Sequence, residues 1–177
     1  FYMSVNLSQK ERSLLTDLKG HEEVCIEKYS NYANQANDPE LKNMFNTHES
    51  DEKDHLNTIN QILSGTVPSM GAGGGVGGGA GAAGTSGTSR TAGTAMPKTS
   101  NMQSQGKSTG MNNADASSLC KDLLMTEKYV SNSYDTSIFE FKDTGVRDAL
   151  NHIQKEEQKH GEDLYNYMAK NNMYNMQ

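Results

Sequence analysis

The sequence predicts an all-α fold, a four-helix bundle made of two helical hairpins. Two observations lead to this prediction. Apolar residues recur at spacings of three and four along four segments, as they do on the buried face of an amphipathic helix. In addition, a small set of polar residues occurs twice in the sequence, and each residue of the second copy follows its counterpart by 105 positions. The first copy is Glu22, Tyr29, Glu52 and His55, and the second is Glu127, Tyr134, Glu157 and His160.

The first hairpin is expected over residues 8–64. Its first helix should begin at Ser8, because Ser8 and Glu11 form a capping box that satisfies two backbone N–H groups. This helix should run to about Ala36, after which Asp38 caps a second helix that starts at the next residue, a proline. The inward-facing residues should be Leu14, Leu15, Leu18, Glu22, Cys25, Ile26, Tyr29 and Ala33, followed by Leu41, Phe45, His48, Glu52, His55, Ile59 and Ile62.

Residues 65–113 are expected to form a flexible linker, because they hold 14 of the chain's 17 glycines and are otherwise mostly Ser, Thr and Ala. A random coil of this length spans roughly 35 to 40 Å, about the length of the predicted helices. The linker should therefore cross the bundle and begin the third helix at the end where the first helix begins. A long crossover between two hairpins is the ferritin-like topology.

The second hairpin is expected over residues 114–174. One helix should run from about Asp115 to Lys142 and the other from about Thr144 to Asn171. Together the two hairpins should form one bundle domain, because each alone has too few residues to bury a sizeable core. The inward-facing residues should be Leu119, Leu123, Glu127, Val130, Tyr134 and Phe141, followed by Val146, Leu150, Ile153, Glu157, His160, Leu164 and Tyr167.

The repeated carboxylates and imidazoles lie inside these apolar stripes. A Glu in a protein core must be paired, protonated or bound to a metal to offset the cost of desolvation. Each E-x-x-H motif places a carboxylate and an imidazole one turn apart on the same helix face. In hairpins that turn at Asp38 and Asp143, residue 22 lies level with residue 54 and residue 127 lies level with residue 159. Both sets can therefore meet at one height.

This arrangement predicts a site for two iron or manganese ions, because hard oxygen donors with some nitrogen favour these metals. Terminal carboxylates would come from Glu22 and Glu127, bridging carboxylates from Glu52 and Glu157, and nitrogen ligands from His55 and His160. Phenolic hydrogen bonds to the ligand carboxylates could come from Tyr29 and Tyr134, which could equally be ordinary core residues.

Other interpretations of these residues stay open. The repeated Glu, His and Tyr could satisfy one another in a polar core without metal, and zinc is an alternative ion. His48 lies on the inward stripe, but its repeat partner is Ile153, so a core or edge histidine is expected there, with an additional ligand as the alternative. A solvated helix face is expected for Glu23, Glu27, Glu49, Glu156 and Glu162.

The formal net charge of −6 and the pI near 5.3 argue against nucleic acid as a partner. No basic tract suggests a membrane surface, and no run of 18 apolar residues predicts a transmembrane helix. The first residues lack the charged and apolar regions of a signal peptide. Synthesis in the cytoplasm without a signal peptide is therefore expected.

Four stretches of the second half resemble the coat F family of bacterial spore coat proteins. They are Asp122-Leu-Leu-Met-Thr-Glu-Lys-Tyr-Val-Ser-Asn-Ser-Tyr134, the segment 143–150, Glu156-Glu-Gln-Lys-His160 and Tyr165-Asn-Tyr-Met-Ala-Lys-Asn-Asn-Met-Tyr174. The resemblance is strongest over residues 117–174, and residues 12–63 look like a more diverged copy. Asn172 and Met173 stand where the family usually has Gly-Trp. The resemblance implies a ferritin-like fold, expression during sporulation, and a place in the spore coat or on the spore surface.

The leading hypothesis is a spore-associated structural or assembly protein that retains a dinuclear metal site, with itself or other spore coat proteins as partners. The alternative is an enzyme, namely a ferritin-like oxidase, a ferroxidase or a peroxide scavenger that uses two iron or manganese ions. A third possibility is a purely structural bundle in which the linker drives self-association. The sequence leaves open whether the protein catalyses a reaction.

Overall fold

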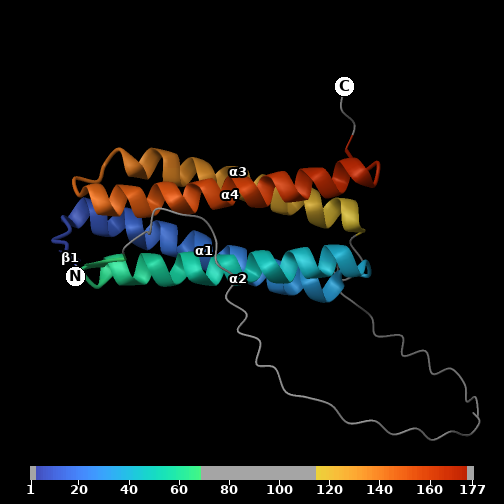
Figure 1. Cartoon of the computed structure of the whole chain (residues 1–177), viewed down its shortest axis with the longest axis horizontal. Coiled ribbons are helices and arrows are strands. Elements are labelled where there is room, and N and C mark those ends of the chain that lie inside the picture. Colours follow the sequence, from blue (N-terminus) through green and yellow to red (C-terminus); the bar gives the residue numbers. More distant parts are fainter. Residues whose placement is uncertain (1–2, 69–114, 175–177) are drawn as a thin grey trace, which may run out of the picture.

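The computed structural model describes residues 3–68 and 115–174 and shows an all-α four-helix bundle (Figure 1). The first hairpin consists of α1 (Gln9–Gln35) and α2 (Pro39–Leu63), and the second of α3 (Ala116–Ile138) and α4 (Thr144–Lys170). Across the bundle, α1 packs beside α3 and α2 beside α4. The four-helix bundle predicted from the sequence is thus confirmed.

The helix boundaries follow mainly from local capping. Ser8 and Glu11 form the predicted capping box at the start of α1, and Asp38 caps α2 with Pro39 at its first turn. Asp115 and Asp143 cap α3 and α4 by accepting backbone N–H groups.

The predicted end of the third helix near Lys142 is wrong, because α3 ends at Ile138. The following turn is held by tertiary contacts. Glu11 accepts the backbone N–H of Lys142 at 2.9 Å, and Arg147 donates to the carbonyl oxygens of Phe141 and Lys142 at 2.8 Å each. The Phe141 side chain is buried as predicted, although it belongs to this turn and not to the helix.

The third helix also starts at the other end of the bundle from the one predicted. Arg12, near the start of α1, donates to the carbonyl oxygen of Leu63 at the end of α2. Lys10 pairs with Glu140, just after α3, whereas Lys28 pairs with Asp122 near the start of α3. The start of α1 thus lies beside the end of α3, and the two helices are antiparallel. The end of α2 and the start of α3 therefore lie at opposite ends of the bundle (Figure 1). Most of the segment between them, residues 69–114, lies outside the described residues, so its flexibility stays a prediction.

A short strand pair, not expected from the sequence, closes one end of the first hairpin. In β1 (Met3–Ser4) and β2 (Thr66–Val67) the chain pairs antiparallel, with Met3 opposite Val67. Gly65 enables the turn before β2 because its φ of 92° lies in a region that favours glycine.

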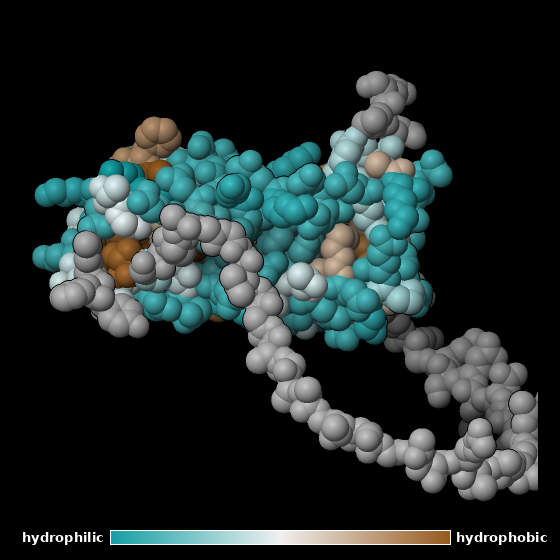
Figure 2. All heavy atoms as spheres, in the orientation of Figure 1, coloured by the Kyte–Doolittle hydropathy of each residue, from teal (hydrophilic) through white to brown (hydrophobic). Residues whose placement is uncertain are grey.

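Two apolar clusters fill the bundle and leave a polar layer between them. One includes Leu15, Leu18, Ile59, Ile62, Val146 and Leu150, and the other includes Leu41, Phe45, Leu119, Leu123, Leu164 and Met168. The bundle face seen in Figure 2 is mainly hydrophilic, as expected when the apolar stripes face inward. The candidate functional residues lie between the two clusters.

Candidate metal centre

The structure brings all six candidate ligands together in the middle of the bundle. Each helix contributes at least one of them, and each residue is at most 2% exposed: Glu22, Glu52, His55, Glu127, Glu157 and His160. They form two overlapping groups of four, and within each group one ligand atom per residue lies within 4.8 Å of the others. Residues far apart in the sequence thus converge at one height.

The first group surrounds the Nδ1 atom of His55. This nitrogen lies 3.2 Å from Glu52 Oε2, 3.3 Å from Glu157 Oε1 and 3.6 Å from Glu22 Oε2. One imidazole nitrogen therefore faces three carboxylates that come from three different helices.

The second group repeats this arrangement around the Nδ1 atom of His160. The distances are 3.1 Å to Glu52 Oε1, 3.6 Å to Glu127 Oε1 and 3.7 Å to Glu157 Oε2. The two groups share Glu52 and Glu157. Each of these carboxylates turns one oxygen to His55 and the other to His160, which is the geometry that a carboxylate bridging two ions would need.

The two repeated tyrosines cross between the hairpins. Tyr29 on α1 donates its phenolic O–H to Glu127 on α3, and Tyr134 on α3 donates to Glu22 on α1. Both tyrosines are fully buried. Each therefore fixes the carboxylate of the opposite hairpin from outside the cluster of six candidate ligands.

The outward-facing nitrogens of the two histidines are also held across the bundle. His55 Nε2 lies 2.8 Å from Glu156 on α4, and His160 Nε2 lies 3.3 Å from Asp51 on α2. Such contacts fix the orientation of a metal-binding histidine. From the sequence, a solvated face was expected for Glu156, and Asp51 was not a candidate for the site. The signal was present, because residues 51 and 156 stand at the repeat offset, but the change from Asp to Glu concealed it.

His48 breaks the symmetry of the cluster. Its ring stacks on that of His160 with centroids 4.2 Å apart, and its Nε2 lies 3.3 Å from Asp163. Burial and the neighbouring His160 lower the pKa of His48 to about 4. It is a buried core histidine next to the ligand groups, in keeping with the position expected from the stripe.

Burial and close contacts shift the titration of the six residues in different directions. Burial raises the pKa of Glu22 and of Glu127 well above the usual range. Burial opposes ionisation of Glu52 as well, but hydrogen bonds with His160 and His55 hold its pKa well below the usual range. Despite burial, the pKa values of His55 and His160 are raised by the surrounding carboxylates. Without metal, the cluster therefore holds protons on several of its groups.

The donor set fits metal ions. One oxygen each of Glu22 and Glu127 and both oxygens of Glu157 are buried without a hydrogen-bond partner. Such atoms are costly in a core, because they have lost water and gained no hydrogen bond, although three of them lie 3.3 to 3.7 Å from a histidine Nδ1. Four ionised carboxylates would be balanced by two divalent cations, with both imidazoles neutral and free to coordinate.

The comparisons with known proteins concern the second hairpin. Residues 115–177 match the family model of the Coat F domain. The second hairpin is therefore similar to the Coat F domain. This match confirms the resemblance seen in the sequence of the second half. No curated protein and no solved structure matches the chain.

The segment that matches the Coat F domain supplies Glu127, Glu157 and His160, together with Tyr134 and Glu156. The remaining members of the cluster come from the first hairpin, which lies outside the family match. In the part of the chain that the structure describes, no helix has the length and apolarity needed to cross a membrane.

Proposed function

We propose that the protein is a structural or assembly component of the spore coat whose ferritin-like bundle holds two iron or manganese ions. One observation carries the metal proposal, namely the burial of four carboxylates and two imidazoles in two groups that share Glu52 and Glu157. The Coat F match supports the location in the spore coat or on the spore surface. The expected partners are other copies of the chain or other coat proteins.

Within this proposal each ion has its own ligands and two shared ones. Glu22 and His55 would bind one ion, and Glu127 and His160 the other, while Glu52 and Glu157 would bridge the pair. Oxygen-rich donor sets with some nitrogen suit iron and manganese. Either metal would supply one-electron redox chemistry when bound. Tyr29 and Tyr134 would keep the terminal carboxylates oriented through their hydrogen bonds.

Metal analysis of the full chain purified without added metal tests the centre. About two iron or manganese ions per chain are expected. The double variant Glu52→Ala, Glu157→Ala should lose both. The matched control is Asp54→Ala, Glu162→Ala, which removes two exposed carboxylates from the same two helices and should retain the metal. Far less than one ion per unaltered chain, even after incubation with Fe²⁺ or Mn²⁺, would contradict the proposal.

Assembly is tested by sedimentation of the full chain and of a variant in which residues 69–114 are replaced by a Gly/Ser segment of equal length. Equal length matters because the end of α2 and the start of α3 lie at opposite ends of the bundle. A particle of several chains that persists after replacement would assign the contacts to the bundle, and one that falls apart would assign them to the segment. Single chains in both cases would exclude self-association and leave other coat proteins as partners.

An enzyme is the second candidate, as a ferritin-like oxidase, a ferroxidase or a peroxide scavenger. The observation that favours it is a pocket between α3 and α4 that is lined by two of the ligand carboxylates, Glu127 and Glu157. Oxygen and peroxide consumption by the metal-loaded chain tests it. Turnover that is lost in the Glu52→Ala, Glu157→Ala variant would support the enzyme, whereas a loaded chain without turnover would favour the structural role.

A further inference from the structure

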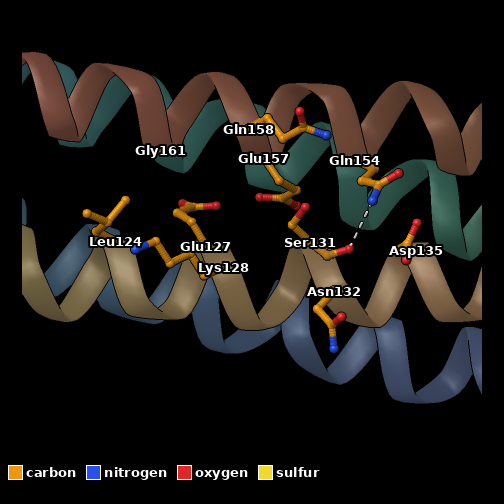
Figure 3. Close-up of a pocket in the computed structure, with 10 residues that line it drawn as sticks. All are labelled: Leu124, Glu127, Lys128, Ser131, Asn132, Asp135, Gln154, Glu157, Gln158 and Gly161. Carbon is orange, nitrogen blue, oxygen red and sulfur yellow. Dashed lines mark hydrogen bonds between the residues drawn. The ribbon is translucent and has the colours of Figure 1, made fainter.

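A pocket of about 470 Å³ lies between α3 and α4 and reaches the candidate metal centre from one side of the bundle. Figure 3 shows the carboxylates of Glu127 and Glu157 pointing toward one another across this space. These side chains are only 2% and 0% exposed. The pocket therefore approaches the ligands closely without leaving them open to solvent.

The two carboxylates are incompletely satisfied on this side. Glu127 Oε2 and both oxygens of Glu157 are buried without a hydrogen-bond partner. A cation arriving through the pocket would therefore meet carboxylate oxygens that are not occupied by hydrogen bonds.

Most of the residues that line the pocket have polar side chains, although carbon atoms make up most of the surface that faces the space. Hydroxyl and amide side chains come from Ser131, Asn132, Gln154 and Gln158. Gln154 donates to the carbonyl oxygen of Ser131 at 3.2 Å and so joins the two helices beside Glu157 (Figure 3). Such oxygens can replace part of a hydration shell.

Two residues that line the pocket have larger apolar counterparts in the first hairpin. Ser131 and Gly161 line the pocket, and their counterparts in the first hairpin are Ile26 and Leu56, which are half-buried. Large apolar side chains thus stand on α1 and α2 where a hydroxymethyl group and a hydrogen atom stand on α3 and α4. These smaller side chains leave more room between α3 and α4.

We infer that the pocket between α3 and α4 is the path by which hydrated divalent cations reach and leave the candidate metal centre. The inference rests on the proposed metal function and adds the side of the bundle from which the ions enter.

The test is to place the side chains of the first hairpin in the pocket of the second. The variant Ser131→Ile, Gly161→Leu has at these two positions the residue types of their counterparts, Ile26 and Leu56. A Cβ atom at Gly161 would meet only Leu124 Cδ1, at 3.6 Å, so the helix should accept a side chain there. Uptake of Co²⁺ by the metal-free full chain is followed by visible absorption, and removal is followed after addition of a chelator. Both rates should fall at least about tenfold, while the dissociation constant changes by less than about threefold.

The matched control is Gly20→Leu, which adds the same side chain to a helical glycine on α1. A Cβ atom there meets nothing within 4 Å, and Gly20 lines a different pocket, between α1 and α3. Its uptake rate should equal that of the unaltered chain. An unchanged rate in the double variant, or a slower rate in Gly20→Leu alone, would overturn the path and leave the metal centre intact. An unaltered chain that takes up no Co²⁺ would overturn both.

A second variant tests the path without altering the core. Lys128 and Asp135 are the charged residues at the exposed rim of the pocket. Lys128→Glu should speed Co²⁺ uptake by about two- to tenfold at low salt, because a negative rim attracts cations, and added salt should remove the effect. The control is Lys121→Glu, an exposed lysine of α3 outside the pocket. Equal acceleration in both variants would assign the effect to net charge and contradict the path.

Discussion

The first hairpin, α1 and α2, and the second, α3 and α4, supply matching side chains to the buried cluster. Each contributes one Glu from its first helix, an E-x-x-H pair from its second, and a tyrosine that binds the other hairpin's Glu. A buried charge tolerates little change, since each polar atom must find a partner where water is excluded.

The hairpins differ at positions around the cluster. Ile26 and Leu56 correspond to Ser131 and Gly161, and His48 corresponds to Ile153. Apolar positions accept such changes when neighbouring side chains take up the space. The two hairpins thus have the same residues at the few positions that form the cluster. The residues around the cluster differ between them, so the two sides of the bundle are not alike.

The largest effect is expected from the carboxylates that both groups share. Glu52→Gln and Glu157→Gln should each lose both ions, because either change removes a negative charge from both groups. Glu22→Gln and Glu127→Gln should each retain about one ion, because each affects one group. Metal content per chain measures this. Equal loss in all four variants would contradict a division into shared and terminal ligands.

Bound metal should stabilise the folded bundle, because both hairpins supply its ligands. Free metal at about 1,000 times its dissociation constant should raise the free energy of unfolding by about 4 kcal/mol for each ion, provided that the unfolded chain does not bind it. Thermal unfolding with Mn²⁺ and with a chelator measures the shift. The Glu52→Gln, Glu157→Gln variant serves as the control and should show no shift.

Metal affinity should increase with pH in both hairpins alike. Burial raises the pKa of Glu22 and Glu127, and nearby carboxylates raise the pKa of His55 and His160, so these groups hold protons in the metal-free protein. Binding two ions should therefore release about four protons, and the affinity should fall as the pH decreases. Calorimetry in buffers of different ionisation enthalpy counts the protons. Affinity that is independent of pH would contradict this protonation pattern.

The tyrosines test how symmetric the centre is. Tyr29→Phe and Tyr134→Phe each remove one hydrogen bond to a terminal carboxylate and should weaken metal binding by about 10- to 100-fold. The two effects should agree within a few-fold. Titration with Co²⁺ measures both, and Tyr165→Phe, a half-buried tyrosine of α4 that belongs to neither ligand group, is the control. A large effect in one variant alone would show that the two groups are not equivalent.

The smallest effect is expected at the acids that hold the outer histidine nitrogens. Asp51→Asn and Glu156→Gln keep the shape of each side chain but remove its charge, at sites that remain partly exposed. Each should weaken metal binding by no more than about tenfold. Glu156 should matter more than Asp51, because its contact is shorter, 2.8 Å against 3.3 Å. The reverse order in a Co²⁺ titration would contradict this ranking.

Local sequence signals predicted three of the four helix ends on the hairpin turns and the six clustered residues. The capping residues Ser8, Asp38 and Asp143 act within one turn of the backbone, so their effect can be read without the rest of the chain. The heights of Glu22 and Glu127 followed from the constant rise of an α-helix. The end of α3 at Ile138 was missed, since contacts of Glu11 and Arg147 with the following turn replace the helix there.

By itself, the sequence determined that there are four helices, which face of each is buried, and which polar residues share one level. These properties depend on the period and rise of a single helix. Only the tertiary structure decided that α3 starts at the end opposite to the start of α1, that Glu156 and Asp51 hold the histidines of the other hairpin, and that the pocket opens between α3 and α4. Those features depend on how one hairpin is rotated and shifted against the other, which is set by the packing of all the side chains between them.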